Sequence, residues 1–315
     1  MMRIVYMGTP EFAVAPLEGL LEMGETVVGV FTQQDKPQGR GMKMAPPPVK
    51  KAALEHDLPV FQPRSFKTEE AFQQLKDLEP DLVVVTAYGQ ILPKRVLELP
   101  RYGCVNVHAS LLPDYRGASP IQQVILRGET KTGVTIMQMD RGLDTGDILL
   151  MQEIPIEPLL LKLSRYLEED ADFYRTLVRA NGSEIFMEKL KKGEITPEPQ
   201  PKECRFYAPL IKKQDGQIHF TESAVTIDRM ARGLTPWPGI FTTFQGKTIK
   251  LFGIHVKEGS GGEPGAILDC SPEGLTVACP DGQGVIDQLQ APGGKRMACV
   301  DYFRGHPYNK DDRFE

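Results

Sequence analysis

The amino-acid sequence predicts an α/β protein, in which a doubly wound, mostly parallel sheet is followed by a small, OB-like β-barrel. Strand-like and helix-like patterns alternate through the first half of the chain, as in strand–helix–strand units. After residue 204 the runs become short and alternating and are separated by Gly, Pro and Asp, which is typical of a barrel or sandwich. Between these two regions, residues 193–203 (GEITPEPQPKE) are polar and Pro-rich and indicate a linker.

We therefore expect two domains, residues 1–203 with the linker at about 193–203, and residues 204–315. A chain of 315 residues can form both, at ~100–200 residues per domain. The apolar fraction of 41% and the charged fraction of 25% are ordinary for a folded globular protein, so both domains are expected to have a hydrophobic core.

In the first domain, an apolar strand over residues 3–7 is expected to end at Gly8, and a helix to run from Pro10 to about Met23. Proline is tolerated in the first turn of a helix, and Glu11 is favourable near the positive end of the helix dipole. The continuous apolar run DLVVVT (81–86) suits the centre of a parallel sheet. Other strands are predicted at residues 27–32, 59–61, 105–108 and 148–154, and other helices at residues 48–56, 69–78 and 159–191.

The second domain is expected to consist largely of short strands. Each candidate run alternates apolar and polar residues and is bounded by turn-forming residues, as barrel strands are. The predicted strands are residues 239–244, 248–252, 265–268, 275–278 and 284–289.

Several features indicate a cytoplasmic protein without a membrane anchor. The N-terminal apolar run is interrupted by Gly8 and is too short for a signal peptide. No run of about 18 apolar residues could span a bilayer. The five cysteines (Cys104, Cys204, Cys270, Cys279 and Cys299) are scattered, which indicates reduced thiols, with neither a disulfide framework nor a zinc site.

Positive charge is concentrated in one loop of a chain whose net charge is −5. Residues 33–51 carry one acid, Asp35, against five basic side chains, and the glycines and prolines of QQDKPQGRGMKMAPPPVK predict a long loop. A basic loop on an acidic body can bind a polyanion, but taken alone a bare charge run is better explained by a solvated loop. The five basic residues are Lys36, Arg40, Lys43, Lys50 and Lys51.

The first glycine-containing turn, Met7-Gly8-Thr9-Pro10-Glu11-Phe12, differs from the dinucleotide-binding fingerprint. That fingerprint requires glycines that let the backbone approach a pyrophosphate, and they are missing here. A nicotinamide or flavin cofactor is therefore not expected.

The densest chemical pattern lies in residues 104–120. Asn106 and His108 are two positions apart at the end of a predicted strand, so their side chains share one face at the edge where α/β sheets bind ligands. An amide donor beside an imidazole can stabilise an oxyanion and move a proton during acyl transfer. The alternative is an Asn and a His that hold a turn together.

A second pattern, Asp140 to Asp147 (DRGLDTGD), combines acids and glycines in a tight loop before a strand. Asp144 beside His108 would fix the tautomer of the imidazole and favour its charged form, although Asp and Gly also populate turns for local reasons. The sequence has no serine in a nucleophile elbow, and the remaining histidines (His56, His219, His255 and His306) lack metal-ligand spacing. Direct attack of a substrate amine on a bound acyl group is the simplest remaining chemistry.

Over almost its full length the chain resembles the methionyl-tRNA formyltransferases. The catalytic motif alone is shared with other folate-dependent formyltransferases. The resemblance rests on MGTPEFA (7–13), DKP with GRG and PVK (35–50), NVHASLLP (106–113) with YRG (115–117) and Pro120, GLDTG (142–146), YAPLI (207–211), RGL (232–234) and PWPG (236–239).

This resemblance implies a monomeric, metal-independent enzyme that moves formyl from 10-formyltetrahydrofolate to the α-amine of methionyl initiator tRNA. Asn106 and His108 would polarise the formyl oxygen, and Asp144 would orient His108. Folate would be bound by Ser110, Leu111, Leu112 and Pro113 and, through backbone groups, by Ala87, Tyr88, Gly89, Gln90, Ile91 and Leu92. The acceptor stem of the tRNA would meet Arg40, supported by Lys36 and Lys43.

The sequence departs from the family after Ile156, because the usual Asp-Thr and Gly-Ala pairs are missing from residues 157–175. Leucines at spacings of three and four still predict a helix there. The departure from the family therefore concerns the start of this helix and its contact with the Asp144 loop. Other readings remain: a formyltransferase acting on a sugar nucleotide or glycinamide ribonucleotide, a formyl-folate hydrolase, or a non-catalytic RNA-binding relative. The basic loop and a second domain bearing Lys212, Lys213, Lys247 and Lys250 favour tRNA.

Overall fold

The computed structural model describes residues 1–38, 42–156, 182–259 and 262–315, which form two compact units. The first unit comprises Met1–Pro120, Lys131–Pro155 and the described residues from 182 to Ala208. The second comprises Ile121–Thr130 and Pro209–Glu315. The segment predicted as a linker therefore belongs to the first unit.

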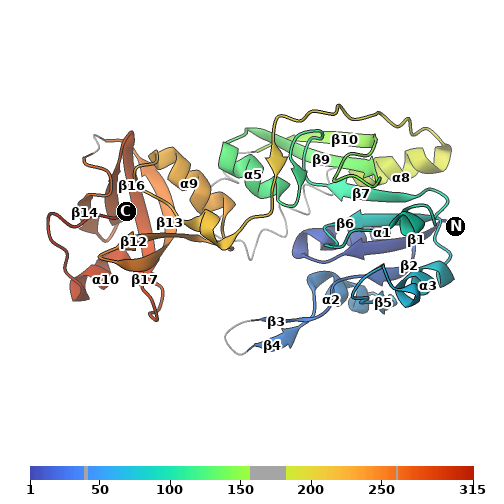
Figure 1. Ribbon diagram of the computed structural model, residues 1–315, viewed down its shortest axis with the longest axis horizontal. Helices are drawn as coiled ribbons and strands as arrows, with labels where there is room; N and C mark the ends of the chain where they lie inside the picture. Colours follow the sequence, from blue (N-terminus) through green and yellow to red (C-terminus); the bar gives the residue numbers. More distant parts are fainter. Residues whose placement is uncertain (39–41, 157–181, 260–261) are drawn as a thin grey trace. The chain divides into compact units, whose positions relative to one another are not determined.

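A seven-stranded sheet forms the centre of the first unit, in the order β10-β9-β7-β6-β1-β2-β5 (Figure 1). Five neighbouring strands are parallel, and β9 pairs antiparallel with both β7 and β10, so the predicted mostly parallel sheet is confirmed. The strands are β1 (Arg3–Gly8), β2 (Thr26–Phe31), β5 (Val60–Phe61), β6 (Leu82–Thr86), β7 (Cys104–His108), β9 (Lys131–Gln138) and β10 (Ile148–Pro155).

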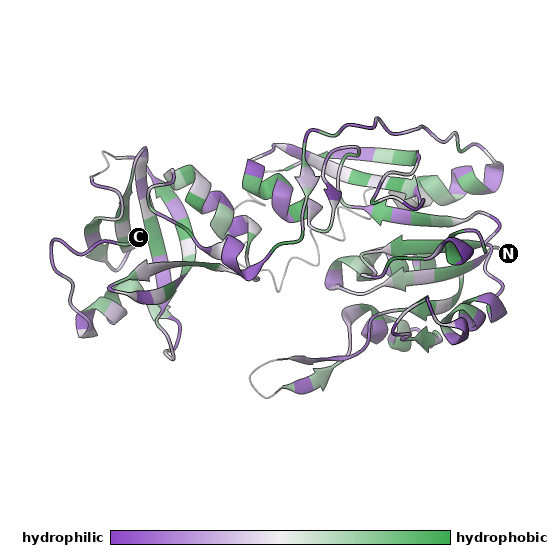
Figure 2. Cartoon of the chain, in the orientation of Figure 1, coloured by the Kyte–Doolittle hydropathy of each residue, from purple (hydrophilic) through white to green (hydrophobic). Residues whose placement is uncertain are grey.

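Helices cover both faces of this sheet because its central strands are apolar on both sides. In β1, Ile4 and Tyr6 join one core and Val5 and Met7 the other, as the alternation of side chains along a strand requires. The first core includes residues of α1 (Val14–Glu22), α2 (Pro48–Glu55) and α8 (Gly182–Lys192), and the second includes residues of α3 (Glu69–Asp77) and α4 (Lys94–Leu97). Figure 2 shows hydrophobic residues concentrated along these strands.

Some elements were not anticipated. Strand β9 was not predicted, although it joins β7 to the predicted strand β10. The basic loop contains a short antiparallel hairpin of β3 (Lys36–Gln38) and β4 (Lys43–Ala45). Of the helix predicted over 159–191, only α8 falls in the described part of the chain; the atypical segment 157–175 lies outside it.

The second unit is built on an antiparallel sheet in the order β12-β13-β16-β15-β14, with β17 (Met297–Ala298) paired to β16. Isolated bridges from Phe314 to Phe244 and from Arg313 to Ala266 connect the C-terminal segment to both edges of this sheet. The C-terminal domain of antiparallel strands is confirmed. Its strands and principal helix are β12 (Ile240–Phe244), β13 (Lys247–Lys257), β14 (Ile267–Ser271), β15 (Gly274–Cys279), β16 (Gly282–Gln290) and α9 (Ala224–Gly233).

Candidate active site

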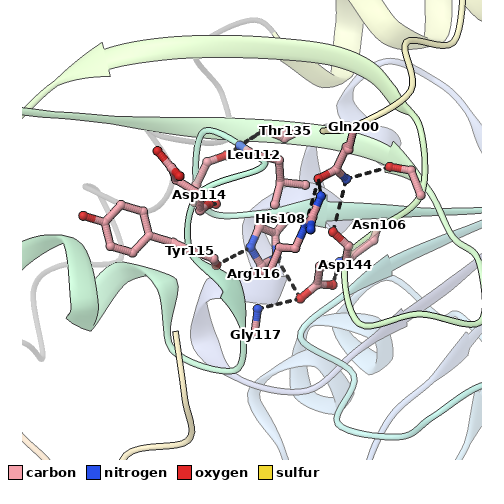
Figure 3. Close-up of polar contacts among 12 residues, drawn as sticks. Asn106, His108, Leu112, Asp114, Tyr115, Arg116, Gly117, Thr135, Asp144 and Gln200 are labelled. Carbon is pink, nitrogen blue, oxygen red and sulfur yellow. Dashed lines mark hydrogen bonds and ion pairs between the residues drawn. The ribbon is translucent and has the colours of Figure 1, made fainter. Parts of the chain in front are cut away.

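Asn106 and His108 lie at the carboxyl end of β7, on the same face of the sheet. Val105 and Val107 point to the opposite face and pack into the core beneath α1, so strand alternation directs the two polar side chains away from that core. His108 is only 5% exposed, whereas Asn106 is half-buried. The shared face that their spacing predicted is therefore present (Figure 3).

Asp144 reaches this strand end from the loop between β9 and β10. Its Oδ1 accepts a hydrogen bond from Asn106 Nδ2 at 3.3 Å, and its Oδ2 accepts one from the backbone N–H of Gly117 at 2.9 Å. The backbone of Asp144 has φ +52°, a left-handed conformation that Asp tolerates better than most residues. Asp140 shapes the same loop, since its carboxylate accepts from Gly142 N and Thr145 Oγ1, both at 2.9 Å.

The His108 ring lies between a carbonyl and a carboxylate. Its Nε2 is 3.0 Å from the Tyr115 carbonyl oxygen, which can only accept, so Nε2 carries a proton. Its Nδ1 faces Asp144 Oδ2 at 3.8 Å, an ion-pair distance that exceeds a hydrogen bond. The Tyr115 carbonyl therefore fixes the tautomer of the imidazole, and Asp144 faces Nδ1 without a hydrogen bond to it.

The turn that follows β7 is held by Thr135 of β9. Thr135 Oγ1 donates to the Ser110 carbonyl at 2.7 Å and accepts from Leu112 N at 3.2 Å, while Ser110 Oγ donates to the Asp114 carbonyl at 2.7 Å. Ser110 and Leu112 are buried, whereas Leu111 and Pro113 are half-buried. The predicted folate-binding stretch 110–113 thus forms a fixed turn directly beyond His108.

The other predicted folate-binding stretch, residues 87–92, follows the neighbouring strand β6. The Tyr88 carbonyl accepts from Thr9 Oγ1 at 2.9 Å and from Gln33 Nε2 at 3.1 Å, and Gln90 Nε2 donates to the Pro63 carbonyl at 2.9 Å. Tyr88 and Leu92 are buried, whereas Ala87, Gly89 and Ile91 are exposed. Burial raises the pKa of the Tyr88 phenol, which stays neutral. Because Val85 of β6 pairs with Asn106 of β7, both stretches leave the same edge of the sheet.

Of the predicted tRNA-contacting residues, Lys36 and Lys43 lie exposed on the β3–β4 hairpin, and Arg40 lies outside the described residues. The base of the hairpin is anchored by Lys50, whose Nζ is 2.8 Å from Asp35 Oδ1 and 2.8 Å from Gln62 Oε1. The amide of Gln62 also donates to the Gln33 carbonyl at 2.7 Å. A continuous set of hydrogen bonds therefore connects the hairpin base to the 87–92 loop through Gln33.

Four residues near the site were not singled out by sequence reasoning: Thr135, Gly117, Arg116 and Gln200 (Figure 3). Gln200 lies in the Pro-rich segment whose composition suggested only a linker. Arg116 and Gly117 belong to the quoted YRG motif, and their position after the NVHASLLP motif was the available signal. Gly117 has φ +123°, and a Cβ there would lie 2.3 Å from the Ala208 carbonyl oxygen, so only glycine fits.

The assembled groups are suited to acyl transfer at a tetrahedral centre. An amide, an imidazole and a carboxylate converge at one strand end, and such groups can donate to an oxyanion and carry a proton. Within the described ranges, no group of three His, Cys, Asp or Glu side chains could hold a metal ion. In the same ranges, every helix is too short or too polar to cross a bilayer.

Comparison with known proteins identifies the relatives of this chain. A model described as formyl transferase matches residues 2–169, and one described as formyl transferase, C-terminal domain, matches residues 210–307. The methionyl-tRNA formyltransferase of Geobacter sulfurreducens is 45% identical over 307 residues, covering 96% of this chain and 94% of that protein. The enzyme of that name from Myxococcus xanthus is 46% identical, with coverages of 96% and 95%.

Solved structures show the same fold at low identity. A methionyl-tRNA formyltransferase from Clostridium thermocellum aligns with a TM-score of 0.53 at 19% identity, covering 82% of this chain and 96% of that chain. HypX from Aquifex aeolicus in complex with tetrahydrofolic acid aligns with a TM-score of 0.64 at 17% identity. The alignment covers 100% of this chain but only 50% of HypX.

Proposed function

This chain belongs to the methionyl-tRNA formyltransferase family, and we propose that it transfers the formyl group of 10-formyltetrahydrofolate to the α-amino group of methionyl initiator tRNA. The single observation that carries the mechanism is the convergence of Asn106, His108 and Asp144 at the end of β7. We further propose a cytoplasmic enzyme, because formylation of initiator tRNA serves the initiation of protein synthesis. The chain acts as a monomer with folate as a cosubstrate and without a metal.

In this mechanism the substrate amine attacks the formyl carbon directly, without a covalent enzyme intermediate. One N–H of Asn106 Nδ2 donates a hydrogen bond to Asp144 Oδ1, and the other is left to donate to the developing oxyanion. His108 accepts the proton of the attacking amine at Nδ1, and the resulting imidazolium supports the same oxyanion before it passes that proton to N10 of the folate. The amine loses one proton when the new C–N bond forms, and N10 of the folate gains one when the old C–N bond breaks, so the site needs no net proton supply.

Formyl-folate is proposed to bind along the carboxyl edge of the sheet, between the turn 110–113 and the loop 87–92. These segments combine buried anchors with exposed positions, since Tyr88 and Leu92 are buried while Ile91 is 95% exposed. Backbone groups of the loop would read the polar edge of the pterin, and the apolar side chains of Leu111 and Leu112 would contact its ring.

The acceptor is proposed to be a tRNA because of the basic hairpin. Lys36 and Lys43 are exposed on a hairpin whose base is fixed by the ion pair of Lys50 and Asp35. Their positive charges are therefore held on an anchored hairpin. Arg40 falls between Lys36 and Lys43 in the sequence and is outside the described residues. Such cations neutralise phosphates and make affinity dependent on salt.

One assay tests this proposal. Purified protein is incubated with 10-formyltetrahydrofolate labelled in the formyl group and with methionyl initiator tRNA, glycinamide ribonucleotide, an amino-sugar nucleotide or no acceptor. We expect label on the methionyl-tRNA alone. Label on a small amine would show that this amine, and not the tRNA, is the acceptor. Release of free formate with every acceptor would identify a hydrolase.

A further inference from the structure

The side-chain amide of Gln200 bridges two parts of the candidate site (Figure 3). Its Nε2 donates to the carbonyl of Asp144 at 3.1 Å and to the carbonyl of Gly146 at 2.6 Å. Its Oε1 accepts from Arg116 Nε at 3.0 Å and from Arg116 Nη2 at 2.8 Å. Both amide protons and the amide oxygen are therefore used, and only this orientation of the amide satisfies all four contacts.

Arg116 is buried, with 2% of its surface exposed, and it anchors the segment that carries Gln200. Besides the two bonds to Gln200, its Nη2 donates to the Pro201 carbonyl at 2.8 Å and its Nη1 to the Lys202 carbonyl at 3.2 Å. A buried guanidinium is costly unless its donors are satisfied, so these contacts fix the segment firmly.

The neighbours of Arg116 in sequence contact the reacting groups. Tyr115 accepts from His108 through its carbonyl, and Gly117 donates its N–H to Asp144. The Asp144 loop is therefore held from two sides: its carboxylate by Asn106 and Gly117, and its backbone by Gln200. The left-handed backbone of Asp144 makes the second support important, because an unfavourable φ persists only where the surroundings hold it.

From this geometry we propose that Gln200 is a positioning residue for Asp144, and that Arg116 holds Gln200 in place. The proposal rests on the proposed function, since it assigns Gln200 an effect on formyl transfer. Gln200 acts through the backbone on both sides of Thr145 and sets where the Asp144 carboxylate stands relative to His108. The segment after α8 thus completes the catalytic site in addition to connecting the two units.

Two substitutions test the side-chain amide of Gln200: one changes only its NH2 end, and the other removes the whole amide. Gln200→Glu keeps an oxygen for Arg116, and its negative charge strengthens that contact, but it places a second acceptor against the carbonyls of Asp144 and Gly146. Gln200→Met keeps the length of the side chain but removes the hydrogen bonds to Arg116 and those to the carbonyls of Asp144 and Gly146. We expect kcat to fall roughly tenfold or more in both variants, with the KM for formyl-folate changed less than about twofold, as for a group that affects the reacting geometry and not ground-state binding.

A matched control is Gln73→Glu, which makes the same chemical change on an exposed face of α3. It should leave both kinetic constants at the wild-type level. Thermal unfolding of all three variants is measured in parallel. A melting temperature near that of the wild type in Gln200→Glu would show that the loss of kcat is not a loss of folded protein.

A double-mutant cycle decides whether Gln200 acts through Asp144. In an Asp144→Asn background, Gln200→Glu should lower kcat less than about twofold, because the carboxylate it positions is already absent. An equal tenfold loss in both backgrounds, or full kcat in Gln200→Glu, would overturn the proposal. Failure of the proposed function is distinct: wild-type protein would then place no formyl on methionyl-tRNA in the first place.

Discussion

Asn106 and Asp144, 38 positions apart in the chain, are hydrogen-bonded through Nδ2 and Oδ1 at 3.3 Å. This contact connects the end of β7 to the loop before β10 and holds the carboxylate that faces His108. A substitution of either side chain should therefore shift the position of the other. It should also shift the imidazole of His108, which lies between Asp144 and Tyr115.

Asp144→Asn should lower kcat for formyl transfer by roughly 10²-fold or more, on the scale of losing a positioned charge or donor. The amide keeps the shape of the side chain but cannot stabilise a charged imidazole. Steady-state kinetics with methionyl-tRNA would measure the change, and unaltered thermal unfolding would serve as the control. Turnover near that of the wild type would remove Asp144 from the mechanism.

Gly117→Ala should lower the free energy of unfolding by about 1–3 kcal/mol, because it forces an L-residue into a conformation it rarely adopts. The added Cβ would also lie 2.3 Å from the Ala208 carbonyl, so the N–H that Asp144 accepts must move. Gly19→Ala in α1 is the matched control, since nothing lies within 4 Å of its added Cβ. Denaturant unfolding should show a loss in the first variant and none in the second.

Lys36→Ala and Lys43→Ala should each raise the KM for methionyl-tRNA several-fold and weaken its dependence on salt, because each removes a cation that can meet a phosphate. Arg40→Ala should have the same effect, and the KM for formyl-folate should stay constant in all three variants. Lys76→Ala, on α3, is the control: it tests whether the loss of any surface lysine raises the KM for methionyl-tRNA. A parallel rise in both KM values would mean that the hairpin supports folding and not tRNA binding.

Asp35 should make the hairpin base sensitive to acid. Hydrogen bonds from Lys50 and then Gln62 hold the pKa of its carboxyl below the ordinary value of 3.8. The stabilisation is therefore complete above that ordinary value and is lost as pH falls through the lowered one. The stability difference between wild type and Asp35→Asn should stay constant from neutral pH to about pH 5 and shrink in stronger acid, as followed by thermal unfolding.

Local patterns were sufficient to predict most strands of both sheets and the face shared by Asn106 and His108. Alternation along a strand is set by the backbone, and a buried strand must be apolar, so both properties can be read from neighbouring residues. Strand β9 was missed although it completes the sheet between β7 and β10. Its place depends on antiparallel pairing with strands far away in the chain, which no local pattern records.

The sequence by itself determined the α/β class, the face shared by Asn106 and His108 and the basic loop, because each is a matter of composition or of spacing over a few residues, and the resemblance to a family added Asp144 as their proposed partner. Only the tertiary structure decided how these three residues are held. Gln200 lies in a Pro-rich segment whose composition indicates a linker, yet it contacts Asp144, 56 positions away, and Arg116, 84 positions away. Such contacts form only after the chain has folded, because an amide has no preferred partner until burial brings donors and acceptors within reach.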